Sequence, residues 1–273
     1  MQRRVYATPS QEAFLEGHAE AFEVLGGCPA VHIRYDNLKP AVRQVLFGRS
    51  RVESARWASF RSWFGLSAFY CGPGVEGAHE KGGVEQEGGR FRRKHLVPSP
   101  EVKTLAELNE RLAAIDAAED ARHIHGRPTS IGFDFEQERG LLAPLPADGY
   151  DTGLDLTPTV HRNSRITVRQ CYYSVPARFI GTQVRVKLKA NELLVFDGRQ
   201  VVAHHPRLTR RYTFHVTASA GSCRCRCPPR RDHRPLRPPK IPGSARGPQP
   251  FRIHAVLGLS ERRARRRRRS PAR

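Results

Sequence analysis

The stretch HIRYDNLKPAV, residues 32–42, decides how the first part of the chain is interpreted. Its residues alternate in polarity up to Tyr35, which is typical of a β-strand, and Asp36 and Asn37 follow at the carboxyl end. Because α/β folds place ligands and active-site groups at the carboxyl ends of strands, Asp36 is a candidate metal ligand. An Asp-Asn pair also turns a chain, and the stretch taken alone favours a turn.

The segments around this strand predict alternating strands and helices. Residues 10–27 have Ser10 at an N-cap position, apolar residues near one face and two glycines as a stop signal. Helical spacing recurs in residues 51–65 and, weakened by glycines, in residues 81–96. Short strand-like runs occur at residues 3–7 and 66–71. This alternation predicts an α/β layer over residues 1–98.

The second half of the chain changes character twice. Residues 104–123 predict a helix that begins at Thr104, and we expect residues 99–157 to form a helical connector. Residues 158–206 predict a small all-β barrel or meander, with turn signals at Asn191 and at Asp197-Gly198. Residues 207–273 lack apolar periodicity and predict a disordered Arg/Pro-rich tail.

The net charge of +21 over 273 residues suggests a polyanionic partner, most simply nucleic acid. The charge is unevenly distributed, because residues 207–273 hold 20 Arg and Lys against two acids. The rest of the chain is therefore nearly neutral.

The cysteines and the hydropathy pattern indicate a compartment. Of the six cysteines, Cys28, Cys71 and Cys171 stand singly, which does not suggest a disulfide framework. No apolar run approaches 18 residues and no signal peptide pattern is present. We therefore expect a cytoplasmic chain without a membrane span.

Further candidates for chemistry lie in HEKGGVEQEGGRFRRKHL, residues 79–96. Glu85 follows a Gly-Gly pair that lets a substrate approach the backbone, although Glu80 and Glu87 are close enough to compete for its role. Four basic residues could follow a phosphate backbone: Arg90, Arg92, Arg93 and Lys94. A solvated charged helix face would look the same.

Several motifs together carry a family resemblance. They are TPSQEAFLEGHAEAFEVLGG (8–27), IRYDNLKPAV (33–42), YCGPGVEGAHEKGGVEQEGGRFRRKHLVP (70–98) and VRQCYYSVPARFIG (168–181). The chain resembles the IstA-type insertion-sequence transposases from residue 4 to about residue 206. The resemblance implies an integrase catalytic core of the RNase H-like DDE superfamily, followed by a β module that contacts DNA.

The resemblance also implies roles for individual residues. In the family three carboxylates hold two Mg²⁺ ions (or Mn²⁺), and the second Asp and the Glu correspond to Asp36 and Glu85. Asn37, His79 and Lys81 are neighbours of this site, and Lys81 joins the basic residues as a DNA contact. The implied partners are insertion-sequence ends and target DNA, an ATP-binding helper protein, and further copies of the chain in a homo-oligomer on DNA.

The printed chain departs from the family pattern at both ends. Met1 lies inside the segment that resembles the family's third strand, so we expect the first two strands, the first catalytic Asp and the N-terminal helix-turn-helix region to be missing. Two carboxylates hold a two-metal site poorly, so we expect little or no nuclease activity and no transposition. The tail from about residue 208 is either a frameshift product or a real basic DNA-binding tail. A non-catalytic DNA-binding regulator of the element is the alternative function.

Overall fold

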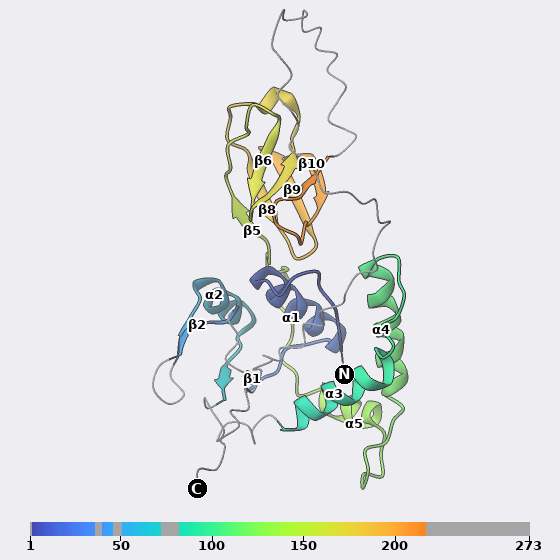
Figure 1. Ribbon diagram of the computed structural model, residues 1–273. Helices are drawn as coiled ribbons and strands as arrows, with labels where there is room; N and C mark the ends of the chain where they lie inside the picture. The colour runs from blue at the N-terminus through green and yellow to red at the C-terminus, as the bar shows by residue number, and fades with distance from the viewer. Residues whose placement is uncertain (1, 36–39, 46–50, 72–81, 217–273) are drawn as a thin grey trace, which may run out of the picture.

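The computed structural model describes residues 2–35, 40–45, 51–71 and 82–216, and gives the backbone alone at 43–45, 51 and 82–85. These residues form a mixed α/β structure (Figure 1). The helices are α1 (Gln11–Leu25), α2 (Ala55–Phe64), α3 (Gly82–His95), α4 (Leu105–Glu119), α5 (Ile131–Arg139) and the 3₁₀ turn η1 (Ala177–Phe179). The strands are β1 (Ile33–Tyr35), β2 (Val42–Val45), β3 (Arg51–Glu53), β4 (Ala68–Tyr70), β5 (Leu154–Leu156), β6 (Arg165–Val168), β7 (Cys171–Ser174), β8 (Arg185–Leu188), β9 (Glu192–Asp197), β10 (Gln200–Pro206) and β11 (Phe214–His215).

The helix predicted from residue 10 is confirmed as α1. Ser10 caps it, because its Oγ accepts a hydrogen bond from the Ala13 N–H at 3.2 Å. Gly26 ends it in the left-handed conformation with φ 76°, which glycine adopts without steric cost. Leu15 and Phe22 on its buried face contact the layer formed by α2, β1 and β4.

The first layer is built around a parallel strand pair. β1 pairs in parallel with β4 from Ile33↔Ala68 to Tyr35↔Tyr70, and both strands lie within segments that the sequence predicts as strands, residues 30–35 and 66–71. Trp57 and Phe60 of α2 are fully buried beneath this pair. The antiparallel β2–β3 hairpin lies next to α2 and was not predicted from the sequence.

The strand prediction for residues 3–7 is wrong, because the structure has no strand there. The extended segment is held instead by side chains of α4. The Asn109 amide accepts from Val5 N–H at 2.8 Å and donates to the Val5 carbonyl at 3.0 Å. A single side-chain amide thus replaces the two hydrogen bonds that a neighbouring strand would make. Val5 then packs on Phe91 of α3 and Leu108 of α4.

The helical segment after residue 98 begins as predicted and contains a second helix. Thr104 caps α4 by accepting from the Glu107 N–H at 3.1 Å, and Glu107 accepts from the Lys103 N–H at 2.8 Å. α5 follows, and the chain then returns to the first layer. There Cys28 and Ala143 exchange two backbone hydrogen bonds of 2.8 Å.

The β module lies at one end of the molecule, beyond α1 (Figure 1). Its described strands form a four-stranded sheet of order β10-β9-β8-β5 and a three-stranded sheet of order β11-β7-β6. Twelve buried residues fill its core, with Ile166, Val186 and Leu193 fully inaccessible. Two open sheets of this kind are not a closed barrel, so the prediction of a small barrel is corrected to a pair of packed sheets.

Residues 207–216, which the sequence placed in the tail, pack on the β module. Leu208 N–H donates to the Tyr173 hydroxyl at 3.0 Å, and Leu208 contacts the module's core. β11 pairs in parallel with β7, with Phe214 opposite Tyr172. Residues 217–273 of the predicted tail lie outside the described residues.

Two further predictions concern the described residues only. Cys28, Cys71 and Cys171, which stand singly in the sequence, are all buried. None of the described helices combines the length and the apolar character that crossing a membrane requires.

Candidate functional site

The predicted catalytic edge lies where β1 and β4 end. The Cys71 N–H donates to the Tyr35 carbonyl at 2.9 Å, so the parallel pairing continues to the last residue of β1. Both strands therefore leave the sheet at the same edge. Asp36 and Asn37 follow β1 directly but lie outside the described residues, as do His79, Glu80 and Lys81. Glu85 is placed by its backbone in the first turn of α3, and its side chain is not described.

A chain of side-chain hydrogen bonds holds Tyr70, the last residue of β4, in place at this edge. The Trp57 indole N–H donates to the Tyr70 hydroxyl at 2.8 Å, and that hydroxyl donates to Glu53 at 2.6 Å. Arg61 holds the same carboxylate at 2.6 Å. Burial, together with the hydrogen bond to Glu53, raises the pKa of the Tyr70 hydroxyl, so it stays a neutral donor. The Glu53 carboxylate therefore serves to hold the Tyr70 hydroxyl at the end of β4.

Glu87 is a poor candidate for the metal-ligand role that is predicted for Glu85. Its carboxylate binds Arg90 at 2.7 Å, Arg3 at 3.1 Å and Arg122 at 3.4 Å. The hydrogen bond from Arg90 is the main cause that holds the pKa of Glu87 below its usual range. A carboxylate neutralised by three guanidinium groups is a poor ligand for a cation. Residues two apart do not share a helix face, so position 85 lies on another side of α3.

The basic residues of α3 divide into two groups. Arg90 and Lys94 face α4, where both bind the buried carboxylate of Glu119 at the end of the helix, with Lys94 at 2.8 Å. The hydrogen bond from Arg90 is the main cause of the strongly lowered pKa of Glu119. Arg92 is partly buried and Arg93 is exposed, and neither has a carboxylate partner among the described residues. The positive charge of Arg92 and Arg93 is thus the part of this helix that is not compensated within the described chain.

No metal centre can be assembled from the side chains that the structure describes, because they contain no group of three or more His, Cys, Asp or Glu residues placed to hold an ion. The predicted ligands Asp36 and Glu85 are outside this set. Their carboxylate oxygens are donors of the type that Mg²⁺ and Mn²⁺ prefer.

A second basic surface is not among the sites predicted from the sequence. It lies on the β module around Arg162, Arg165 and Tyr172. The signal that could have found it is the composition of residues 156–191, which contain seven Arg and Lys and no acid. This run was obscured by the larger charge of the tail.

Comparison with known proteins finds that most of the chain is similar to transposases. Residues 145–216 match the family model of the Mu transposase C-terminal domain. A transposase for insertion sequences IS1326/IS1353 from Pseudomonas aeruginosa is 30% identical over 207 residues, which are 75% of this chain and 40% of that relative. A transposase from Aminobacter aminovorans is 28% identical over 76% of this chain and 40% of its own length. A transposase for insertion sequence element IS232 from Bacillus thuringiensis subsp. berliner is 27% identical over 72% of this chain and 45% of its own length. The chain spans about two fifths of the length of these relatives.

Proposed function

Because the chain is a relative of the insertion-sequence transposases, we propose that it acts in DNA transposition, by binding DNA and by supplying two of the carboxylates for metal-dependent strand cleavage and transfer. Little or no nuclease activity is still expected of a site that has these two carboxylates alone. The observation that carries this proposal is the similarity to several transposases over about three quarters of the chain. The Mu transposase domain match over the β module adds to it. These relatives lend no support to the alternative of a non-catalytic regulator.

The finer fold that we propose for the first part is the RNase H-like integrase core. The parallel β1–β4 pair, covered by α1 and α2, supports this proposal. In such a core Asp36 and Glu85 hold a divalent cation, Mg²⁺ or Mn²⁺. When bound, the cation stabilises the negative charge that develops on the phosphate oxygens during strand cleavage. The role of the chain's own residues is to hold these two carboxylates in position. Asp36 follows β1, which pairs with β4, and Glu85 lies on α3, which Glu87 ties to neighbouring segments through its ion pairs.

The DNA contacts that we propose are electrostatic. Arg92 and Arg93 of α3 are the strongest members of the predicted set, because the described chain offers them no carboxylate. Arg90 and Lys94 contribute to the positive field of the same helix while they bind Glu119. Lys81 completes the set. We propose an ATP-binding helper protein and a homo-oligomer on DNA as partners, and a cytoplasmic location, on the strength of the family resemblance.

Iron-directed cleavage of the protein tests the metal site without requiring DNA cleavage. Fe²⁺ takes the place of Mg²⁺, and with ascorbate and peroxide it generates radicals that cut the backbone near the bound ion. We expect fragments that end near residues 36 and 85, and their loss in Asp36→Asn and Glu85→Gln. Glu23→Gln is the matched control, since this exposed α1 carboxylate has no ion-pair partner among the described residues. Cutting that ignores both substitutions, or that excess Mg²⁺ does not suppress, contradicts the proposed ligands.

Electrophoretic mobility shift with duplex DNA tests the partner. We expect binding whose logarithmic affinity falls linearly with the logarithm of salt concentration. Arg93→Ala should reduce the steepness of that dependence by about one. Arg127→Ala is the control, because this exposed arginine already pairs with Asp134 at 3.3 Å. A chain that binds no duplex at low salt would overturn the proposed function.

A further inference from the structure

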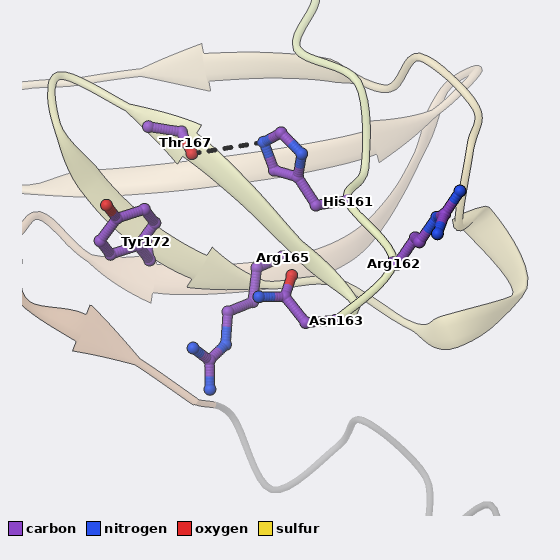
Figure 2. A pocket seen from close by; sticks show the side chains of 6 residues that line it. All are labelled: His161, Arg162, Asn163, Arg165, Thr167 and Tyr172. Atoms are coloured by element: carbon purple, nitrogen blue, oxygen red, sulfur yellow. Dashed lines mark hydrogen bonds between the residues drawn. The ribbon is translucent and has the colours of Figure 1, made fainter. Parts of the chain in front are cut away.

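An open cavity of about 570 Å³ lies on the outer face of the three-stranded sheet (Figure 2). Strand β6, the start of β7 and the loop before β6 line it, with side chains of four chemical kinds: cationic, amide or hydroxyl, imidazole and aromatic. The lining residues are His161, Arg162, Asn163, Arg165, Thr167 and Tyr172. This cavity is separate from the β1–β4 edge and has no role in the site described above.

The pleat of the sheet explains which side chains reach the cavity. Successive residues of a strand point to opposite faces, and Ile166, Val168 and Tyr173 fill the module's core. Arg165, Thr167 and Tyr172 therefore face outward. The register places Thr167 opposite Tyr172 on β7 and Tyr172 opposite Phe214 on β11. The outer face thus combines two aromatic rings and a guanidinium in adjacent positions.

The aromatic and cationic side chains of this face lie next to one another at the protein surface. Phe214 is 62% exposed, and the Arg165 guanidinium lies over its ring at 5.3 Å from the centroid. Arg162 is exposed on the loop that leads into β6 (Figure 2). Among the described residues neither Arg162 nor Arg165 has a carboxylate partner, whereas Arg56 and Arg207 are both bound to Glu12. The described residues therefore leave the charge on this surface uncompensated.

This combination selects a ligand that has both an anionic and a flat aromatic part. Guanidinium groups bind phosphate, and exposed rings stack on nucleobases with little regard to sequence. In a duplex the base faces are covered by their neighbours, so Tyr172 and Phe214 would have nothing to stack on. In a single strand the bases can be splayed onto an aromatic surface. Asn163, Thr167 and His161 add donors and acceptors for base edges.

We propose that this cavity binds an unpaired nucleotide of a DNA strand, with the phosphate at Arg162 and Arg165 and the base stacked on Tyr172 and Phe214. A volume of about 570 Å³ lies within the usual range for a small-molecule site and is ample for one nucleotide. The inference rests on the proposed function, because it takes DNA as the partner. It adds that the β module recognises DNA that is locally unpaired.

Fluorescence anisotropy with the full chain tests the inference, using a labelled single-stranded oligonucleotide and a duplex of the same sequence. Tyr172→Ala should weaken single-strand binding by about tenfold or more. Duplex binding should change less than about twofold, because the tyrosine stacks only on an exposed base. Tyr172→Phe keeps the ring and should bind as the parent does. Arg165→Ala should weaken single-strand binding and lower the steepness of its salt dependence by about 0.7. Arg199→Ala, in the β9–β10 turn, is its control.

A second variant guards against misfolding of Tyr172→Ala. Thr167→Glu places a carboxylate in the cavity at an exposed strand position, and Gln183→Glu adds the same charge at another exposed position of the module. We expect Thr167→Glu alone to abolish the preference of the chain for the single strand. If the parent chain binds neither DNA, the proposed function fails. If the parent binds both DNAs and the cavity variants bind the single strand equally well, only this inference is overturned.

Discussion

Glu12 and Arg207 are 195 positions apart in the sequence, and their side chains meet at 3.1 Å between Oε2 and Nη1. The two side chains are 1% and 7% exposed, so the pair is shielded from solvent. Glu12 also binds Arg56 of α2 at 3.1 Å, and Arg56 donates to the carbonyls of Thr152 and Gly153 at 2.7 and 3.0 Å. One carboxylate in the first turn of α1 therefore ties the β module to the α/β layer.

Removal of this carboxylate should destabilise the whole chain. Glu12→Ala leaves the Arg207 guanidinium buried without its charge partner, which costs about 3–5 kcal/mol of the free energy of unfolding. Glu23→Ala, at an exposed position of the same helix, should cost less than about 0.5 kcal/mol. Urea denaturation measures both. The double variant Glu12→Ala, Arg207→Ala should cost less than the sum of the single changes, and strict additivity would show that the pair is not coupled.

The amide of Asn109 should be more important to stability than its position on the surface of α4 suggests. Asn109→Asp keeps the acceptor for the Val5 N–H but replaces the donor to the Val5 carbonyl by a carboxylate oxygen. We expect a loss of about 1–3 kcal/mol in the free energy of unfolding, because the carbonyl of a buried residue loses its donor. Glu110→Gln, on the exposed side of the same helix, is the control. Equal stability of Asn109→Asp and the parent would mean that the amide does not hold the N-terminal segment.

The turn between β6 and β7 contains conformational strain. Arg169 and Gln170 have φ of 50° and 64°, in the left-handed region that non-glycine residues avoid. Gln170→Gly should raise the free energy of unfolding by up to about 1 kcal/mol, since glycine adopts this conformation freely. Gln183→Gly should lower it by about 0.5–1 kcal/mol, because Gln183 does not have a positive φ. Thermal unfolding of the two variants should therefore shift in opposite directions.

The buried imidazole of His205 should make stability depend on pH. Its Nε2 lies 2.8 Å from the Ser174 carbonyl and its Nδ1 lies 3.0 Å from Nδ1 of His215. A neutral ring that donates to Ser174 accepts from His215, and a second proton on His205 would oppose that contact. Burial is the main cause of the lowered pKa of His205, and the nearby His215 and His204 lower it further. Tyr173 is the remaining polar ring against it, at 5.4 Å between centroids.

The sign follows from proton binding. Because the folded pKa of His205 is lowered, the unfolded chain binds more protons below the ordinary histidine pKa of about 6.5. The free energy of unfolding should therefore fall as the pH drops below about 6.5, by up to about 1.4 kcal/mol per pH unit. Urea denaturation between pH 5.5 and 7.5 measures this slope. His205→Gln should make the slope shallower, and the buried His18, whose pKa burial also lowers, should account for part of the slope that is left. His125→Gln, at an exposed site, should leave the slope unchanged.

Release of the cations that Glu119 holds should strengthen duplex binding. Glu119→Gln removes the charge that pairs with Arg90 and Lys94, while the amide keeps the shape of the side chain. We expect tighter duplex binding, with a salt dependence steeper by about one for each cation that turns to DNA. Glu110→Gln makes the same change in net charge at an exposed position of α4. If both variants bind alike, Arg90 and Lys94 do not reach the DNA.

Local features were the part of the fold that the sequence by itself determined. Ser10, Thr104 and Gly26 mark helix ends because a cap depends on hydrogen bonds and φ preferences within a few residues. The Asp197-Gly198 turn between β9 and β10 follows from the same kind of short-range rule, with Gly198 at φ 59°. The motif pattern also indicated the transposase relationship, and it named Asp36 and Glu85, which remain predictions.

The tertiary structure decided which charges are neutralised and which are free. Nothing in the sequence distinguishes Arg90 from Arg165. In the structure, however, Arg90 binds Glu119 of another helix, whereas Arg165 faces an open cavity. The sequence also could not show that Asn109 would replace a strand neighbour for Val5, or that Glu12 would meet Arg207. These contacts join residues from 29 to 195 positions apart. Burial and ion pairing depend on which segments the fold brings together, and no pattern of near neighbours contains that information.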